Sequence, residues 1–355
     1  MVLNLGGEPL STHELPAPNR DTHDDLNEAY LHDAQQYALD ADAAEASFTE
    51  EQRAIYQLIL SMTDDPDTYA GKNIVFLDAP GGTGKTFVIN SILKRARSQG
   101  KIAIATATSG IAATLLDNGQ TLHSAFKIPI DSHLQQHPTG KISRGSALAR
   151  KIQQCRLIVV DEAPMAHKSN YEALNLTLRD LCDPDRPMGG IPMLLCGDFR
   201  QLLPVVKGGT RSNIVNASLK KSHLWHHITV RHLTINMRAF ITGNDGAMAF
   251  SDLLLTIGNG TIESSDGHDM INIPSEIGHF VNSLDELMNS VYPDLETNGL
   301  NSEWLSQRAI LSPLNKTVVT LNNCLLDKFP GKKNCTRPPT PMLMMKRLSY
   351  IQLSF

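Results

Sequence analysis

A glycine-rich segment followed by a lysine and a threonine carries the most specific chemistry in the sequence. It runs from Asp78 to Thr86, after an apolar stretch and before the helical pattern of residues 87–96. Glycines let successive backbone N–H groups converge on phosphate oxygens, and the start of a helix adds a positive dipole. The sequence therefore predicts a nucleotide-phosphate loop. Its ligands are Gly81, Gly82, Thr83, Gly84, Lys85, which reaches the β- and γ-phosphates, and Thr86, which ligates Mg²⁺.

Ala79 departs from the usual phosphate-loop pattern. The pattern GxxxxGK[ST] has its first glycine at this position. An ordinary glycine-rich turn is the alternative interpretation, but the flanking apolar run and helix favour a phosphate loop.

Two further polar segments follow apolar runs. Asp161 and Glu162 come directly after residues 157–160, which suits Asp161 to a metal shell and Glu162 to orienting an attacking water. Such a pair is common and is a weak signal by itself. The segment from Gly197 to Val205 follows another apolar run, and its Gln201 is placed to sense the γ-phosphate.

Short apolar runs are the elements that must position these side chains. They cover residues 74–77, 102–105, 157–160 and 193–196, and helical patterns separate them. Such runs are typical of parallel strands buried on both faces. They predict an α/β fold with a doubly wound parallel sheet, in which the polar segments share the carboxyl edge. Thr49 is a candidate N-cap with Gln52 three residues later, so the ordered domain is expected to begin there.

Taken together, these pieces resemble the Pif family of superfamily-one DNA helicases, including the helicase regions of Helitron-type transposons. In order, the matching segments are 77–86, 105–113, 121–124, 161–165, 197–205 and 233–238. The resemblance implies a RecA-like P-loop NTPase domain over 48–240 and a partial second RecA-like domain over 241–331. It implies a monomeric, ATP- and Mg²⁺-dependent 5′–3′ helicase acting on single-stranded and forked DNA. Roles in DNA repair, recombination and telomere maintenance are implied too.

The same resemblance assigns further residues. It implies that Gln52 binds adenine and that Arg238 reaches the γ-phosphate. A helix-capping amide and a surface salt bridge are the respective alternatives. The resemblance also implies DNA contacts from Thr108, Ser109, Gly110, His123 and Phe126. Taken alone, residues 108–110 would be an ordinary loop and helix start, and His123 a structural histidine.

The remaining motifs favour structural roles. Residues 222–227 contain three histidines, but no carboxylate or cysteine stands at zinc spacing, so packing through Ser222 and Trp225 is preferred. The resemblance places a strand at Asn236–Arg238, and the residue pattern predicts another at Arg308–Ser312. A ring-forming ATPase is disfavoured, because residues 197–201 lack its sensor asparagine.

Charge and composition complete the prediction. Residues 1–47 hold ten acidic residues and one basic residue and are expected to be an acidic appendage; residues 48–355 hold 31 basic against 27 acidic residues. No run approaches the roughly 20 apolar residues of a membrane helix, and no secretory or Arg-rich presequence stands at the start. We expect no membrane partner, reduced thiols, and a nuclear or mitochondrial location by resemblance. Residues 332–355 resemble nothing in the family and its late motifs are missing, so a nucleotide- and DNA-binding fragment without motor activity is the alternative function.

Overall fold

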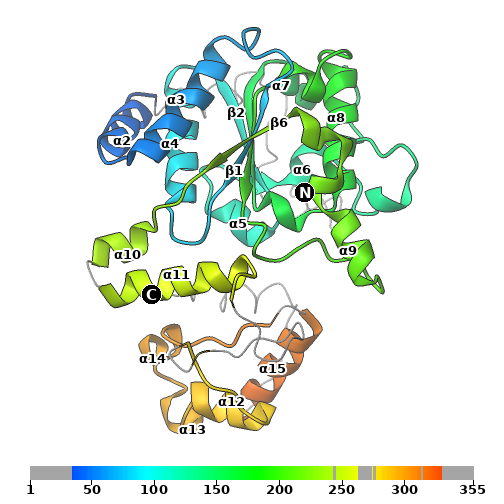
Figure 1. The fold of residues 1–355 in the computed structure, drawn as a ribbon. Coiled ribbons are helices and arrows are strands. Elements are labelled where there is room, and N and C mark those ends of the chain that lie inside the picture. Colours follow the sequence, from blue (N-terminus) through cyan, green and yellow to red (C-terminus); the bar gives the residue numbers. More distant parts are fainter. Residues whose placement is uncertain (1–33, 243–244, 263–273, 275–276, 313–314, 330–355) are drawn as a thin grey trace, which may run out of the picture. The chain divides into compact units, whose positions relative to one another are not determined.

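The computed structural model describes residues 34–242, 245–262, 274, 277–312 and 315–329 (Figure 1). The chain divides into two compact units between Met237 and Arg238. The first unit contains a sheet with helices on both faces, and the described part of the second consists of helices and connecting segments. Among these residues, no helix combines the length and the apolar character needed to cross a membrane.

The first unit is built on a six-stranded parallel sheet. Its order is β3-β2-β4-β5-β1-β6. The strands are β1 (Ile74–Asp78), β2 (Ile102–Ala107), β3 (Gln120–Thr121), β4 (Cys155–Asp161), β5 (Met193–Gly197) and β6 (Ile228–His232). The four predicted runs are β1, β2, β4 and β5, which confirms the α/β fold class. The apolar pattern missed β3, which has only two residues, and β6, an edge strand with an exposed end.

The central strands contain long apolar runs because both of their faces are covered. On β1, Val75 and Leu77 belong to one core cluster, whereas Ile74 and Phe76 belong to the cluster on the opposite face. Successive side chains of a strand point to opposite faces, so burial on both sides requires an unbroken apolar run.

Helices cover the two faces of this sheet. The first cluster includes side chains of α3 (Glu50–Asp64), α4 (Lys85–Ser98) and α5 (Gly110–Thr114). The second includes those of α6 (Leu122–Phe126), α7 (Ala147–Gln153) and α8 (Lys168–Leu181). A further helix, α9 (Arg211–Ala217), follows β5. The predicted cap of α3 is confirmed, because Thr49 and Gln52 form a reciprocal capping box.

The acidic segment contributes a flanking helix, α2 (Ala34–Ala46), which packs along α4. Ala41 is fully buried. Asp40 pairs with Lys94 at 2.5 Å, and Asp42 and Glu45 both pair with Arg95. The acidic side chains therefore neutralise the basic end of α4. Residues 1–33 of the predicted appendage lie outside the described part of the chain.

The histidine-rich segment forms a short 3-10 helix, His223–His227, that is held by packing. The Trp225 ring lies 5.7 Å from both the Phe76 and Phe199 rings, measured between centroids. Ser222 donates a hydrogen bond of 2.7 Å to Glu172. The predicted packing role of Ser222 and Trp225 is confirmed.

The second unit has helices α10 (Met237–Thr242, beginning at the last residue of the first unit), α11 (Asp245–Gly258), α12 (Leu284–Val291), α13 (Leu295–Asn298), α14 (Ser302–Ser306) and α15 (Asn315–Asp327). The Arg308 guanidinium lies over the Trp304 ring at 4.3 Å. The Tyr292 hydroxyl donates to the Arg308 carbonyl at 3.1 Å.

Two predicted strands are wrong. Residues 308–312 are irregular, because the Arg308 carbonyl bonds to a tyrosine and the described residues of this unit include no strand to pair with. No strand forms at Asn236–Arg238, because Met237 already begins α10. The strand of this region is β6, which lies earlier in the sequence and ends at His232. The RecA-like character of residues 241–331 stays a prediction, and the predicted tail at 332–355 lies outside the described residues.

Candidate nucleotide-binding and hydrolysis site

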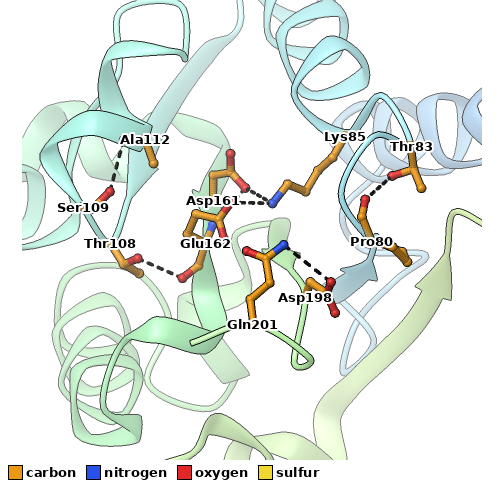
Figure 2. A network of polar contacts seen from close by, with 10 residues as sticks. All are labelled: Pro80, Thr83, Lys85, Thr108, Ser109, Ala112, Asp161, Glu162, Asp198 and Gln201. Carbon is orange, nitrogen blue, oxygen red and sulfur yellow. Dashed lines mark hydrogen bonds and ion pairs between the residues drawn. The ribbon is translucent and has the colours of Figure 1, made fainter. Parts of the chain in front are cut away.

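The glycine-rich segment forms a tight loop between the end of β1 and the first residue of α4, which is Lys85 (Figure 2). Gly82 and Gly84 have φ angles of +87° and +78°, values that glycine adopts at little cost. Thr83 is buried, and its hydroxyl donates to the Pro80 carbonyl at 2.9 Å. The loop therefore turns tightly just ahead of the helix start, where backbone N–H groups and the helix dipole favour an anion.

Ala79 fits the loop without a glycine. Its backbone φ is not positive, and its methyl group is buried in the first core cluster. Its N–H donates to the Gly197 carbonyl of β5 at 3.1 Å. The departure from the usual pattern is thus accommodated by core packing.

Lys85 joins the phosphate loop to the carboxylates that follow β4. Its ammonium nitrogen Nζ lies 3.1 Å from Asp161 Oδ1 and 2.8 Å from Glu162 Oε1. Asp161 is buried, and Lys85 and Glu162 are partly buried. Burial opposes the charged amine, but the two carboxylates outweigh it and raise the pKa of Lys85. The lysine therefore stays charged, and the two carboxylates hold its ammonium group beside the phosphate loop.

Glu162 has a strained backbone that its neighbours hold in place. Its φ is +53°, a left-handed conformation uncommon for a side chain of this kind. Its N–H donates to Asp161 Oδ1 at 2.8 Å, and its carbonyl accepts the Thr108 hydroxyl at 2.8 Å. The Thr108 N–H also donates to the Asp161 carbonyl at 3.1 Å. Such strain persists at functional sites when surrounding contacts over-determine the conformation.

The segment after β5 brings an arginine to the same edge. Asp198 is buried, and Arg200 Nη1 donates to Asp198 Oδ1 at 2.9 Å and to Asp78 Oδ1 at 3.2 Å. Gln201 is exposed, and its amide lies 3.5 Å from Asp198 Oδ2. The sequence interpretation missed the bridging role of Arg200. The sequence pattern that could have indicated this bridge is an acidic residue after each of two apolar runs, Asp78 and Asp198, with Arg200 two positions after the second.

Gln52 performs the capping role and a second one. Its Oε1 accepts from the Thr49 N–H at 3.1 Å, while its Nε2 donates to the Thr83 carbonyl at 3.1 Å. The amide, which is buried, thus connects the start of α3 to the phosphate loop. Adenine recognition by Gln52 stays a prediction. Arg238, exposed on α10, belongs to the second unit, and its γ-phosphate role also stays a prediction.

The residues assigned to DNA have different surroundings in the structure. Ser109 caps α5 by accepting from the Ala112 N–H at 3.1 Å, and Gly110 is exposed, with open space where a Cβ atom would stand. Thr108 is engaged by Glu162, as described above. His123 has one ring nitrogen 3.1 Å from the Ile128 carbonyl and the other 3.5 Å from the Asn170 amide, which fits the structural alternative.

Phe126 requires a correction. Its side chain is 0% exposed and belongs to the second core cluster. Because no face of the ring reaches the surface, it cannot stack on a base. Phe126 is the last residue of α6, and its ring packs in the core between this helix and its neighbours.

The charge balance and the donor set of this edge fit Mg²⁺. Four carboxylates (Asp78, Asp161, Glu162 and Asp198) face two cations (Lys85 and Arg200). In the described part of the chain, no three His, Cys, Asp or Glu side chains form a metal cage on their own.

The parallel sheet, the phosphate loop after β1 and the carboxylate pair after β4 define a P-loop NTPase core. Sequence comparison is more specific. The family described as PIF1-like helicase matches residues 47–268, more than half of the chain, and the protein belongs to this family.

Individual relatives agree with this assignment. The ATP-dependent DNA helicase Pif1 of Psychrobacter sp. (strain PRwf-1) is 28% identical over 228 residues, covering 64% of this chain and 32% of the relative. The ATP-dependent DNA helicase PIF1 of Danio rerio is 33% identical over 165 residues, covering 46% and 24%. The chain thus spans no more than about a third of the curated relatives' length. The crystal structure of Pif1 helicase from Candida albicans shares the fold, with a TM-score of 0.53 at 22% identity over 84% of this chain and 60% of that one.

Proposed function

We propose that this protein is an ATP-dependent DNA helicase of the Pif type, which couples ATP hydrolysis to 5′–3′ movement on single-stranded DNA and to duplex separation. The observation that carries the proposal is the contact of Lys85 with Asp161 and Glu162, at 3.1 and 2.8 Å. It brings the two halves of a hydrolysis site together across the carboxyl edge of the sheet. Family membership supports the helicase activity, because the curated relatives are described as ATP-dependent DNA helicases.

The phosphate loop and its neighbours bind the nucleotide and the metal. Backbone N–H groups of residues 81–84 surround the phosphates, and Lys85 releases its carboxylates to contact the β- and γ-phosphates. Thr86 and Asp161 would hold Mg²⁺, which neutralises charge on the phosphate oxygens when bound.

Glu162 carries out the proton chemistry. Its carboxylate orients the attacking water and accepts its proton, once Lys85 has exchanged that carboxylate for phosphate. The left-handed backbone at Glu162 directs the side chain away from the end of β4 and toward Lys85. Gln201 senses the γ-phosphate, and Arg238 stabilises charge on the transferred phosphoryl group.

The partner we propose is DNA, single-stranded or forked, contacted through Ser109, Gly110 and their neighbours. Small and hydroxylated residues at a helix start permit close approach of phosphates. We further propose that the protein acts as a monomer in the nucleus or the mitochondrion. Family membership is consistent with work in DNA repair, recombination or telomere maintenance.

Steady-state ATP hydrolysis with Mg²⁺ tests the proposal. The 355-residue chain is measured without DNA and with saturating single-stranded DNA, beside Lys85→Ala and the control Lys72→Ala. Lys72 is exposed in the segment before β1, so its removal tests only the loss of a surface charge. We expect hydrolysis that DNA stimulates, that Lys85→Ala abolishes and that Lys72→Ala retains.

A rate that stays flat with DNA, at the level of Lys85→Ala, would contradict the helicase proposal. Nucleotide binding measured on the same preparation then separates two cases. Retained binding would support the fragment without motor activity, whereas absent binding would refute the nucleotide site itself.

A further inference from the structure

Two carbonyl groups of the phosphate loop are held from outside by different parts of the first unit. The Gly82 carbonyl accepts a hydrogen bond of 2.9 Å from the Met237 N–H. The Thr83 carbonyl accepts one of 3.1 Å from the Gln52 side chain. A peptide group is planar, and its N–H points opposite to its carbonyl. Holding these carbonyls therefore fixes the direction of the N–H groups of Thr83 and Gly84.

The two holding elements are also joined to each other, away from the nucleotide site. Thr234, in the segment between β6 and α10, donates its backbone N–H to Glu51 Oε2 at 2.7 Å and its hydroxyl to Glu51 Oε1 at 2.5 Å. Glu51 directly precedes Gln52 in α3. The contacts thus form a closed ring that runs from α3 to the phosphate loop, on to the segment 234–237 and back to α3.

The ring fits closely around the loop. A Cβ atom added at Gly82 would lie 2.5 Å from Asn236 Oδ1, and one added at Gly84 would lie 2.7 Å from Gln52 Nε2. Both distances are shorter than real Cβ contacts. The side chains of Asn236 and Gln52 therefore occupy the space directly beside the two glycines of the loop.

We propose that Glu51 and Thr234 are positioning residues that preset the phosphate loop and transmit its state to the start of α10. When a phosphate turns the loop N–H groups, the opposite carbonyls turn with them, and the Gly82 carbonyl moves the Met237 N–H. Met237 is the first residue of α10, and the next residue is Arg238. The inference rests on the proposed function, since it assigns a device that orients the arginine in response to the nucleotide.

The Glu51–Thr234 contact is exposed at the surface, so it can be removed without unfolding the chain. Binding of a fluorescent methylanthraniloyl-ADP with Mg²⁺ is measured for the wild type, Glu51→Ala, Thr234→Val and the double variant. We expect Glu51→Ala to raise the dissociation constant about fivefold, the equivalent of about one hydrogen bond. Thr234→Val, which keeps its backbone donor, should raise it less, and the double variant should match Glu51→Ala.

Glu50→Ala is the matched control. Glu50 lies in the same first turn of α3, so its loss changes the charge near the helix dipole equally, but its side chain is exposed and outside the ring. Hydrogen exchange of residues 233–242 gives a second readout. ADP should protect this segment in the wild type and in Glu50→Ala, but much less in Glu51→Ala.

The outcomes of these measurements separate a failure of the inference from a failure of the proposed function. Unchanged binding and protection in Glu51→Ala, or an equal loss in Glu50→Ala, would overturn the inference while the proposed function stands. No binding of the ADP analogue by the wild-type chain would overturn the proposed function, and the inference with it.

Discussion

Replacing Arg200 with Met should destabilise the first unit far more than an ordinary surface substitution. Arg200 bridges Asp198 and Asp78, whose side chains are 6% and 17% exposed, and its own side chain is 26% exposed. Removing one partner of a fully buried pair costs about 3–5 kcal/mol, whereas an exposed pair contributes about 0–1 kcal/mol. The partial burial of this site places the expected loss at about 2–3 kcal/mol. For a unit of this size, that loss lowers Tm by roughly 5–10 °C.

Thermal unfolding followed by circular dichroism measures this loss, with Arg144→Met as the matched control. Arg144 pairs with Asp180, but their side chains are 72% and 57% exposed, so solvent screens the pair and its removal should change Tm very little. Burial disfavours the charge of Arg200, yet the two aspartates outweigh it and raise the pKa of Arg200. Because the pKa of this cation is raised in the folded protein, its contribution to stability is complete at every pH well below the ordinary arginine pKa. The difference between wild type and Arg200→Met should therefore be constant from about pH 6 to pH 9.

Two results would refute this reasoning. One is an Arg200→Met protein that melts within about 2 °C of the wild type, which would mean that water already screens the bridge. The other is an equal loss in Arg144→Met, which would show that burial of the Arg200 ion pairs adds nothing to stability.

Three further predictions concern single side chains. Thr108→Val should lower kcat for ATP hydrolysis about tenfold with nucleotide binding retained, because the hydroxyl that holds the Glu162 backbone is lost. Thr108→Ser, which keeps the hydroxyl, should restore kcat, and a normal rate in the valine variant would contradict this reasoning. His167 caps α8 by accepting from the Ser169 N–H, and burial, followed by the nearby charges of His133 and Lys168, lowers its pKa. The free energy of unfolding of the wild type should therefore fall as the pH drops below about 6.5, and urea titrations of His167→Asn should show no such fall. Phe126→Leu should lower the free energy of unfolding by about 1–3 kcal/mol and leave DNA affinity unchanged, and weaker DNA binding at unchanged Tm would reinstate the stacking role.

Several features of this protein are determined locally, and the sequence was sufficient to predict them. The four apolar runs became β1, β2, β4 and β5, because the part of a strand that is buried on both faces is apolar at successive positions. The capping box at Thr49 depends on two residues three positions apart. The loop from Gly81 to Thr86 depends on glycine conformations and on the helix that follows directly. Each pattern is complete within about fifteen residues, so no knowledge of distant contacts was required.

Other features depended on which strands become neighbours. Asp78 and Arg200 are far apart in sequence, and they meet because β1 pairs with β5 in a register that sets Asp78 opposite Gly197. The same packing buried Phe126, which the sequence interpretation had assigned to DNA, and gave Gln52 a second partner in Thr83. Strand order and side-chain burial arise from the packing of the whole core. A local pattern of residue types shows that a side chain can pair or stack, and only the tertiary structure decides what it reaches.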